Sequence, residues 1–312
     1  MDRTEVWRRD RTPMTLPNFL IIGAPKAGTT SLYRYLRQHP QVFMSPAKEP
    51  NFFAFGGDAP PDFNGPGDRD EPTTLDLETY QRLFANVTDE LAAGEASTVY
   101  LYSPDAPQRI HATIPDAKLI AILRNPIDRA FSNYLHLRRS QREPLPDFGQ
   151  ALQAEAERIA NHWKPFWYYQ AQGLYGQQLQ RYLQYFEREQ LGIWLFDDLK
   201  NDELGTIRDI FTFLGVDPTF QPNTGERVRV TPPVPKNQWL HNLLNRPNPL
   251  KAIAKSILPQ GLRAQVSAQV NQKNLTKPKP TERDRAQLIA SYRDDIEQLQ
   301  TILHRDLSHW LR

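Results

Sequence analysis

The chain of 312 residues is long enough to bury the core of one large α/β domain, and its 39% hydrophobic and 24% charged residues are typical of a globular protein rather than a disordered one. Its 38 basic residues nearly balance 36 acidic ones, so net charge argues neither for nor against a polyanionic partner, and any anion site must be local. The lack of cysteine excludes disulfides, thiolate metal sites and a cysteine nucleophile.

The first seventeen residues are charged and polar, and we expect them to form an N-terminal tail (1–17) ahead of a single domain (18–312). No apolar segment follows the basic residues of this tail, so we expect no signal peptide. The longest apolar runs, such as residues 119–123, are far too short to span a bilayer. We therefore expect a soluble, cytoplasmic protein without a membrane span.

Short apolar runs alternate with amphipathic stretches along the first two thirds of the chain. Patterns typical of strands lie at residues 17–23, 41–44, 94–101, 118–124 and 193–196. Helical spacing of apolar residues marks the segments 29–38, 77–84, 104–113, 126–135, 148–160, 171–187 and 206–214. This alternation predicts an α/β fold in three layers (α/β/α), with helices on both faces of a central parallel sheet.

Two stretches depart from this alternation. Residues 56–74 are rich in Gly, Pro and Asp, which is typical of a long surface loop. From residue 218 onward the sequence is Pro-rich, basic and poor in strand patterns, with helices expected at 238–244 and 282–303. We interpret residues 218–312 as a C-terminal extension wrapped on the same domain.

A P-loop-like segment, Gly23-Ala-Pro-Lys-Ala-Gly-Thr-Thr30, joins the first strand to the first helix. In this arrangement backbone amides over the helix N-terminus point at an anion, and hydroxyl groups add further donors. The residues expected to hold the anion are Lys26, Ala27, Gly28, Thr29, Thr30 and Ser31. Nucleotide triphosphatases carry their lysine directly after the second glycine, whereas Lys26 stands inside the loop, where it can reach the bridging oxygen of a leaving group. The alternative is a glycine turn that caps a helix and binds no ligand.

A second anion-binding feature follows the clearest strand. Arg124 stands at the end of this strand, and Ser132 lies about two turns into the next helix. Ligands of open α/β sheets bind at the carboxyl ends of strands, where an arginine can hold a phosphate bidentately. The alternative is an ion pair of Arg124 with Asp128. Two anion sites on neighbouring strands suit a nucleotide phosphorylated at both its 3′ and 5′ positions.

These two motifs together resemble those of the sulfotransferases that use 3′-phosphoadenosine 5′-phosphosulfate (PAPS). Residues 19–32 are similar to the loop that binds the 5′-phosphosulfate, and residues 121–134 to the motif that binds the 3′-phosphate. The chain is most similar to the heparan-type carbohydrate sulfotransferases and their bacterial relatives, from about residue 18 to residue 214. The resemblance implies PAPS as donor, 3′-phosphoadenosine 5′-phosphate (PAP) as product, and no metal.

The resemblance also implies a catalytic base. Residues 48–53 are similar to the segment from which the heparan-type branch takes its catalytic glutamate, so Glu49 is the candidate base. Lys26 would stabilise the leaving phosphate, with Lys48 as a second cation near the transferring sulfuryl group. Asn51 stands where some relatives carry a histidine, and we count it among the acceptor-binding residues. The alternative is a solvated Lys48–Glu49 turn ahead of core aromatics.

Three more residues complete the expected site. Tyr100 lies in a segment that resembles one lining the cleft in relatives, and Tyr175 belongs to an aromatic-rich stretch that could stack a sugar or cover an acyl chain. Both tyrosines could instead pack in the core or in a cleft wall. Lys236 lies in the region where relatives bring a C-terminal loop over the 3′-phosphate.

We therefore expect a sulfotransferase that moves a sulfuryl group from PAPS to a hydroxyl, or to an amine, of a carbohydrate or small-molecule acceptor. We expect no nucleic-acid partner. One alternative is a P-loop kinase of a small metabolite, against which the displaced lysine counts. The other is a non-catalytic nucleotide-binding protein, against which the presence of Glu49 counts. The sequence does not identify the acceptor.

Overall fold

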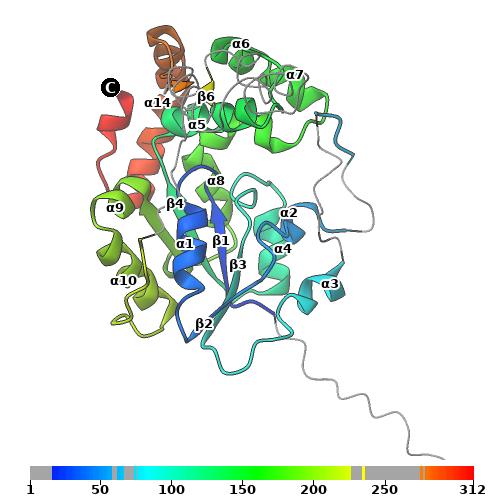
Figure 1. Ribbon diagram of the computed structural model, residues 1–312, viewed down its shortest axis with the longest axis vertical. Coiled ribbons are helices and arrows are strands. Elements are labelled where there is room, and N and C mark those ends of the chain that lie inside the picture. Colours follow the sequence, from blue (N-terminus) through cyan, green and yellow to red (C-terminus); the bar gives the residue numbers. More distant parts are fainter. Residues whose placement is uncertain are drawn as a thin grey trace, which may run out of the picture.

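The computed structural model describes residues 16–57, 62–66, 74, 76–225, 234–235, 275–276 and 278–312. Its centre is a five-stranded sheet with the spatial order β2-β3-β1-β4-β5, in which all neighbouring strands run parallel (Figure 1). The strands are β1 (Phe19–Gly23), β2 (Val42–Met44), β3 (Ala92–Ala96), β4 (Lys118–Leu123) and β5 (Leu191–Leu195). The expected α/β class with a central parallel sheet is confirmed.

The central strand β1 is buried along its whole length, as its continuous apolar sequence predicts for a strand covered on both faces. It lies between β3 and β4, and Phe19 pairs in register with Gly94. A Cβ atom at Gly94 would lie 2.5 Å from the ring of Phe19, so this close approach requires glycine. Because the strands are parallel, the carboxyl ends of β1, β3 and β4 meet at one edge of the sheet.

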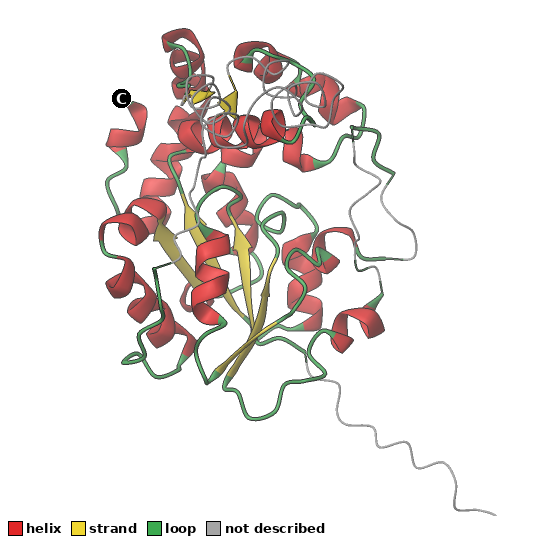
Figure 2. Ribbon diagram, viewed as in Figure 1, coloured by secondary structure: helices red, strands yellow, loops and turns green. Residues whose placement is uncertain are grey.

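Helices cover both faces of the sheet, with α1 in front of it and α8 behind it in Figures 1 and 2. The first helices are α1 (Thr29–Leu36), α2 (Phe52–Phe55), α3 (Leu77–Arg82), α4 (Ala106–Thr113) and α5 (Pro126–Arg139). The later helices are α6 (Phe148–Gln153), α7 (Glu155–Ala160), α8 (Tyr175–Tyr182), α9 (Phe196–Asn201), α10 (Glu203–Leu214) and α14 (Glu282–Leu303). Short 3-10 helices lie at Pro165–Trp167, Ala171–Gly173, Arg188–Gln190 and Ser308–Leu311. In the described part of the chain, no helix is both long enough and apolar enough to cross a membrane.

The helix that follows β4 begins where the sequence predicts. The side chain of Asn125 accepts hydrogen bonds from the amides of Ile127 (3.0 Å) and Asp128 (3.4 Å), and Pro126 occupies the first helical position. This capped start places α5 directly after the carboxyl end of β4. The helix therefore holds its first two turns beside the edge where the strands end.

The expected strand at 94–101 is wrong in its second half, because β3 starts at Ala92 and ends at Ala96. The amide of Ser97 still donates to the carbonyl of Ile21 (3.0 Å), but the chain then turns, and the amide of Tyr100 donates to the carbonyl of Ser97 (3.2 Å). Because the strand has ended, the amide of Thr98 donates to the carboxylate of Glu49 instead of to a neighbouring strand. The hydroxyl of Ser97 accepts from the amide of Asn51.

Two expected helices also differ from the structure. The segment 148–160 is divided at Ala154, which ends α6 and precedes α7. Within 171–187 the regular helix α8 starts only at Tyr175, where the carboxylate of Asp295 accepts hydrogen bonds from the amides of Gly176 and Gln177, both at 2.9 Å. This cap comes from α14, more than a hundred residues away, so local sequence could not have indicated it.

The expected helix at 282–303 is confirmed as α14, which starts at the capping box of Thr281 and Asp284. It packs against α8 and α5, and Leu288, Tyr292 and Ile296 join the main core. A two-stranded antiparallel pair, β6 (Val234–Pro235) and β7 (Leu275–Thr276), lies earlier in this region. The helix expected at 238–244 lies outside the described residues. The division of the chain into a tail, a domain and an extension stays a prediction.

Candidate active site

The loop after β1 has the backbone of an anion cradle. Lys26 and Gly28 adopt left-handed conformations (φ 66° and 96°), and Gly28 is the N-cap of α1. A side chain at Gly28 would be strained at this φ, and its Cβ would meet the ring of Phe196 at 3.2 Å. The amides of Thr29 and Thr30 belong to the first turn of α1, where no helical carbonyl can accept from them. They are therefore available to bind an anion.

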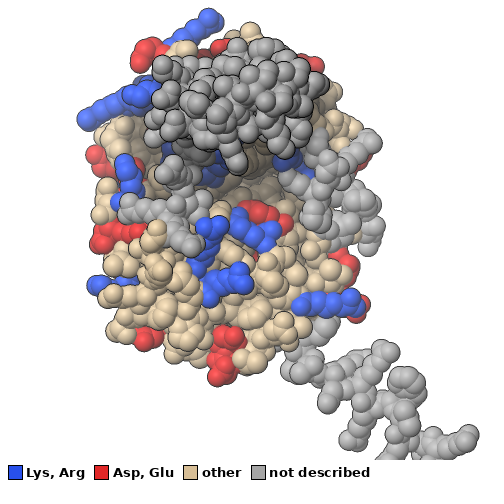
Figure 3. Space-filling model, in the orientation of Figure 1, with Lys and Arg blue, Asp and Glu red and all other residues tan. Residues whose placement is uncertain are grey.

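Positive charge is concentrated at this loop. Burial, together with repulsion from the neighbouring Arg139, Arg124 and Lys48, lowers the pKa of Lys26 to about 8. Figure 3 shows Lys and Arg side chains bordering the hollow at the centre of this face. Cations that lower one another's affinity for protons are stabilised when an anion binds among them. The loop is thus built for a ligand with more than one negative charge.

Arg124 joins the two anion-binding motifs. Its Nη1 donates to the carbonyl of Lys26 (3.1 Å), and its guanidinium lies over the ring of Phe196, 5.1 Å from the centroid. Among the described residues it makes no direct ion pair with Asp128, although the charge of Asp128 acts on it from a greater distance. Burial lowers its pKa. Ser132, on the second turn of α5, is buried. The loop and the end of β4 form one continuous basic surface.

Glu49 is held as an oriented carboxylate. Its Oε1 accepts from the Nζ of Lys48 (2.5 Å), and its Oε2 accepts from the amide of Thr98 (2.8 Å). The amide of Glu49 donates to the carbonyl of Ala96 (2.9 Å), and the residue has a left-handed φ of 61°. The Glu49 side chain is only 34% exposed, so Lys48–Glu49 is not a freely solvated turn. Lys48 thus contacts Glu49 and also lies near enough to Lys26 for its charge to lower the pKa of Lys26.

A cleft of about 180 Å³ opens beside Glu49. Its near side consists of Pro25 from the loop, and of Asn51 and Thr98. The Oδ1 atom of Asn51 is buried and has no hydrogen-bond partner in the described structure, so it can accept a hydrogen bond from a ligand in this cleft. The cleft lies next to the carboxylate of Glu49 and could hold an acceptor group.

The far wall of the cleft is formed by His136 on α5 and by Arg142, Lys164 and Phe166. His136 and Arg142 were not predicted from the sequence. The guanidinium of Arg142 lies over the ring of Trp167, 4.9 Å from its centroid. The aromatic residues of 163–169 indicated either a core or a cleft wall, and that segment contributes both to this wall and, through the fully buried Trp167, to the core.

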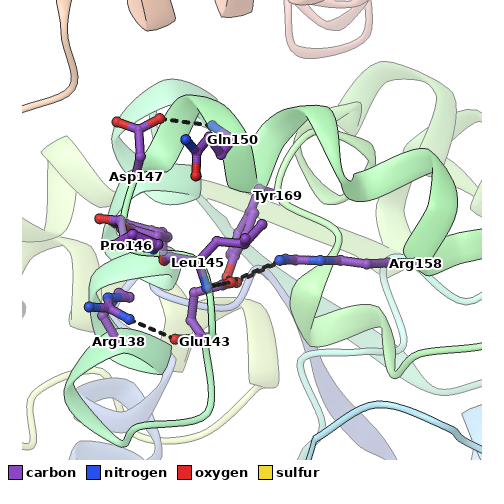
Figure 4. A network of polar contacts seen from close by, with 9 residues as sticks. Arg138, Glu143, Leu145, Pro146, Asp147, Gln150, Arg158 and Tyr169 are labelled. Atoms are coloured by element: carbon purple, nitrogen blue, oxygen red, sulfur yellow. Dashed lines mark hydrogen bonds and ion pairs between the residues drawn. The ribbon is translucent and has the colours of Figure 1, made fainter.

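A buried ion pair follows Arg142 directly in the chain, at Glu143 (Figure 4). Arg158 donates from both terminal nitrogens to the carboxylate of Glu143, each at 2.8 Å, and their side chains are 3% and 0% exposed. Glu143 also accepts from the hydroxyl of Tyr169 (2.5 Å) and the amide of Leu145 (2.9 Å), while Arg138 donates to its carbonyl oxygen (2.9 Å). These bonds fix the turn after α5 and with it Arg142.

Two expected site residues, Tyr100 and Tyr175, do not line the cleft. Tyr100 is fully buried, and its hydroxyl accepts from the amide of Phe53 (3.3 Å). Tyr175 is fully buried and packs edge-on against Trp310, at 6.4 Å between ring centroids. Both tyrosines therefore lie inside the fold. They were expected in the site because the sequence pattern does not distinguish a cleft-lining ring from a packed one. Lys236 lies outside the described residues.

Comparison with known protein families gives one match that covers most of the fold. Residues 17–222 match the model of the sulfotransferase family. A crystal structure of a sulfotransferase from Alicyclobacillus acidocaldarius is 38% identical, with a TM-score of 0.75, over 96% of this chain and 100% of that one. The sheet and its flanking helices therefore have a close structural counterpart.

Curated relatives include two kinds of heparan sulfate enzyme. The mouse bifunctional heparan sulfate N-deacetylase/N-sulfotransferase 4 is 30% identical over 99% of this chain and 32% of its own length. The human heparan sulfate glucosamine 3-O-sulfotransferase 6 is 31% identical over 64% of this chain and 52% of its own length. The chain thus spans about a third to a half of the length of these relatives.

The comparisons overturn one expectation. The chain was expected to be cytoplasmic, but the curated relatives that it matches are heparan sulfate sulfotransferases and not cytoplasmic enzymes. The expectation rested on the lack of a leader pattern and of an apolar run long enough to span a bilayer. Neither feature identifies a compartment, since each is only an absence in the sequence.

Proposed function

The chain belongs to the sulfotransferase family, and from that premise we propose that it transfers the sulfuryl group of PAPS to a hydroxyl of a carbohydrate or small-molecule acceptor, with an amine as the less favoured acceptor group. The observation that carries the proposal is that Glu49 lines the cleft and is bonded to Lys48, whose charge in turn acts on Lys26 of the neighbouring loop. The named heparan sulfate relatives support a carbohydrate acceptor.

The donor would lie along the carboxyl edge of the sheet. The amides and hydroxyls of residues 27–31 suit the 5′-phosphosulfate, and Arg124 with Ser132 suits the 3′-phosphate. Lys236 is proposed to close over the 3′-phosphate on the strength of the family resemblance alone. The shared cationic field of Lys26, Lys48 and Arg124 supports a donor with several negative charges.

The reaction that fits this arrangement is an in-line displacement at sulfur. Glu49 accepts the proton of the acceptor hydroxyl as its oxygen bonds to sulfur, and the bond from sulfur to the bridging phosphate oxygen breaks. Lys26 stabilises the negative charge that develops on this leaving oxygen, and PAP departs. Asn51 and the far wall hold the acceptor so that its oxygen faces the sulfur atom. The sulfuryl group ends on the acceptor and the proton on Glu49.

The test is Glu49→Gln, which preserves the size of the side chain and removes the base. The purified chain is supplied with PAPS and a panel of glucosamine-containing oligosaccharides, simple alcohols and amines, and PAP release is measured. We expect turnover to fall by about 10²–10⁴-fold, while PAP binding by calorimetry stays within about twofold. Glu189→Gln, on an exposed 3-10 turn, is the matched control and should behave as the wild type.

Three outcomes would contradict the proposal. Turnover of Glu49→Gln at the wild-type rate would remove Glu49 as the base. Transfer of phosphate from ATP with Mg²⁺, and none from PAPS, would favour a small-metabolite kinase. Binding of PAP without transfer to any acceptor would favour a nucleotide-binding protein that lacks catalysis.

A further inference from the structure

Glu95 is a carboxyl group with no exposed surface, one residue before the end of β3. The hydroxyl of Ser97 donates to its Oε2 (2.9 Å), and the hydroxyl of Tyr80 donates to its Oε1 (3.4 Å). The hydroxyl of Tyr100 lies close enough to Glu95 to interact with it electrostatically. No lysine or arginine in the described part of the chain pairs with it. Burying a carboxyl group without a cationic partner costs free energy of folding. A residue that carries this cost is a candidate for a role in function.

Two of these hydroxyls connect Glu95 to the turn that carries the base. The hydroxyl of Ser97 accepts from the amide of Asn51 (3.0 Å), and the hydroxyl of Tyr100 accepts from the amide of Phe53 (3.3 Å). The turn needs such anchors, because Glu49 and Asn51 both have left-handed φ angles, 61° and 58°.

We propose that Glu95 is a positioning residue for sulfuryl transfer, which holds the turn of Glu49 in place through the hydroxyls of Ser97 and Tyr100. The inference rests on the proposed function, because it assigns Glu95 a role through Glu49. Glu95 does not line the cleft and touches neither donor nor acceptor. Its contribution is the orientation of the Glu49 carboxylate, and a misplacement of about 1 Å can cost on the order of 10²-fold in rate.

Glu95 performs this role as a neutral acid near pH 7. Burial raises its pKa to about 8; the hydroxyls of Tyr100 and Ser97 oppose this shift, and repulsion from Glu49 adds to it. The groups that face it from the surrounding elements are Tyr80 on α3, Tyr182 on α8, and Glu49, Ser97 and Tyr100 from the two turns. A protonated carboxyl can both donate and accept, so it can order several hydroxyls at once.

The central experiment compares Glu95→Leu with Glu95→Gln. Leucine fills the space but cannot bond the hydroxyls, so we expect kcat to fall by about 10-fold or more, with KM for PAPS unchanged. Glutamine resembles the neutral acid in shape and in its ability to donate and accept, and should restore most of the lost turnover. Equal turnover in Glu95→Leu and the wild type would overturn the inference, as would equal losses in the two variants.

A double variant separates positioning from a general effect on stability. In the Glu49→Gln background, Glu95→Leu should cause no further loss of kcat, because the group that it positions is already gone. Asp295→Leu is the control: it also removes a buried carboxyl, one that caps α8, and its effect should multiply with that of Glu49→Gln. Full multiplication of the Glu95 and Glu49 effects would contradict the inference and leave the proposed function intact.

Two further measurements keep the inference testable if Glu95→Leu does not fold or the acceptor is not found. Ser97→Ala and Tyr100→Phe each remove one link, and each should speed amide exchange at Asn51 or Phe53.

The pH dependence of the melting temperature is the second measurement. A carboxyl whose folded pKa is raised stabilises the fold below its unfolded pKa and loses this contribution as the pH rises through about 8. The wild type should therefore lose melting temperature relative to Glu95→Gln between about pH 5 and pH 8. Unchanged amide exchange, or parallel melting curves, would count against the inference.

Discussion

The two sides of the cleft differ in how their buried charges are balanced: cations face one another at the loop, whereas a cation is paired with a carboxylate behind the far wall. On the side of the loop, where the donor is proposed to lie, Lys26 is near Arg139, Arg124 and Lys48, and burial together with their repulsion lowers its pKa to about 8. Behind the far wall, the charge of Arg158 is matched by the carboxylate of Glu143, at 2.8 Å through two bonds. The cations at the loop repel one another, whereas the charges of the pair behind the wall neutralise each other.

The difference shows which region serves binding and which serves stability. Like charges held together cost free energy in the ligand-free protein, and that cost is recovered when an anion binds. A buried ion pair with all its hydrogen bonds made is a structural element, and removing one partner leaves an uncompensated charge. Substitutions on the donor side should therefore change catalysis more than stability, and substitutions behind the wall should do the reverse.

The largest effect is expected from Arg158→Met. It leaves Glu143 buried without its partner, so the free energy of unfolding should fall by about 3–5 kcal/mol. Denaturant unfolding measures this loss, and PAP binding at a temperature where the variant is folded should change by less than about twofold. Adding Glu143→Leu should recover much of the stability, because no unpaired charge remains. A large loss of PAP affinity in the single variant would remove the contrast between the two regions.

Lys26→Met should show the opposite pattern, with a large loss of kcat and no loss in the free energy of unfolding. The loss of the cation beside the leaving oxygen should lower kcat by about 10²–10³-fold. The free energy of unfolding should not fall, because a cation is removed from a cationic surrounding. Lys200→Met, an exposed lysine on α9, is the control for both measurements. A marked fall in stability with normal turnover would show that Lys26 is structural instead.

The smallest effect concerns the pH dependence of PAP binding. Lys26 loses its proton above about pH 8 in the ligand-free protein, and a bound phosphate raises its pKa by attraction. Binding of PAP should therefore take up a proton, and its affinity should weaken by up to about tenfold per pH unit above pH 8. Calorimetry in buffers of different ionisation enthalpy measures the uptake. Lys26→Arg should abolish it, and uptake that persists in this variant would assign it to another group.

Much of the donor side could be read from the sequence because its signals are local. A buried strand, a glycine turn and a helix start follow one another within residues 19–36, so their order along the chain defines the loop. The same holds for β4, the Asn125 cap and α5. Glu49 came from a family resemblance and not from periodicity. The structure adds that Lys48 and Thr98 hold its carboxylate.

The errors share a physical cause. The strand expected at 94–101 stops at Ala96, and the helix expected at 171–187 becomes regular only at Tyr175, because distant groups compete for the local backbone bonds. Tyr100 and Tyr175 carry no mark in the sequence that separates a buried ring from a cleft-lining one. Glu95 was missed because a carboxyl in a short strand gives no sign that hydroxyls from three elements will enclose it.

The sequence by itself determined the fold class, the anion loop and the two charged motifs, since each rests on neighbouring residues whose geometry is set by the turn or the cap between them. Tertiary structure decided what surrounds Glu49: the cleft, its far wall of Arg142 and Lys164, and the hydroxyl links from Glu95. Apart from the bond between Ser97 and Glu95, those contacts join segments separated by about fifty residues or more, and the free energy of such contacts depends on packing that no local pattern encodes.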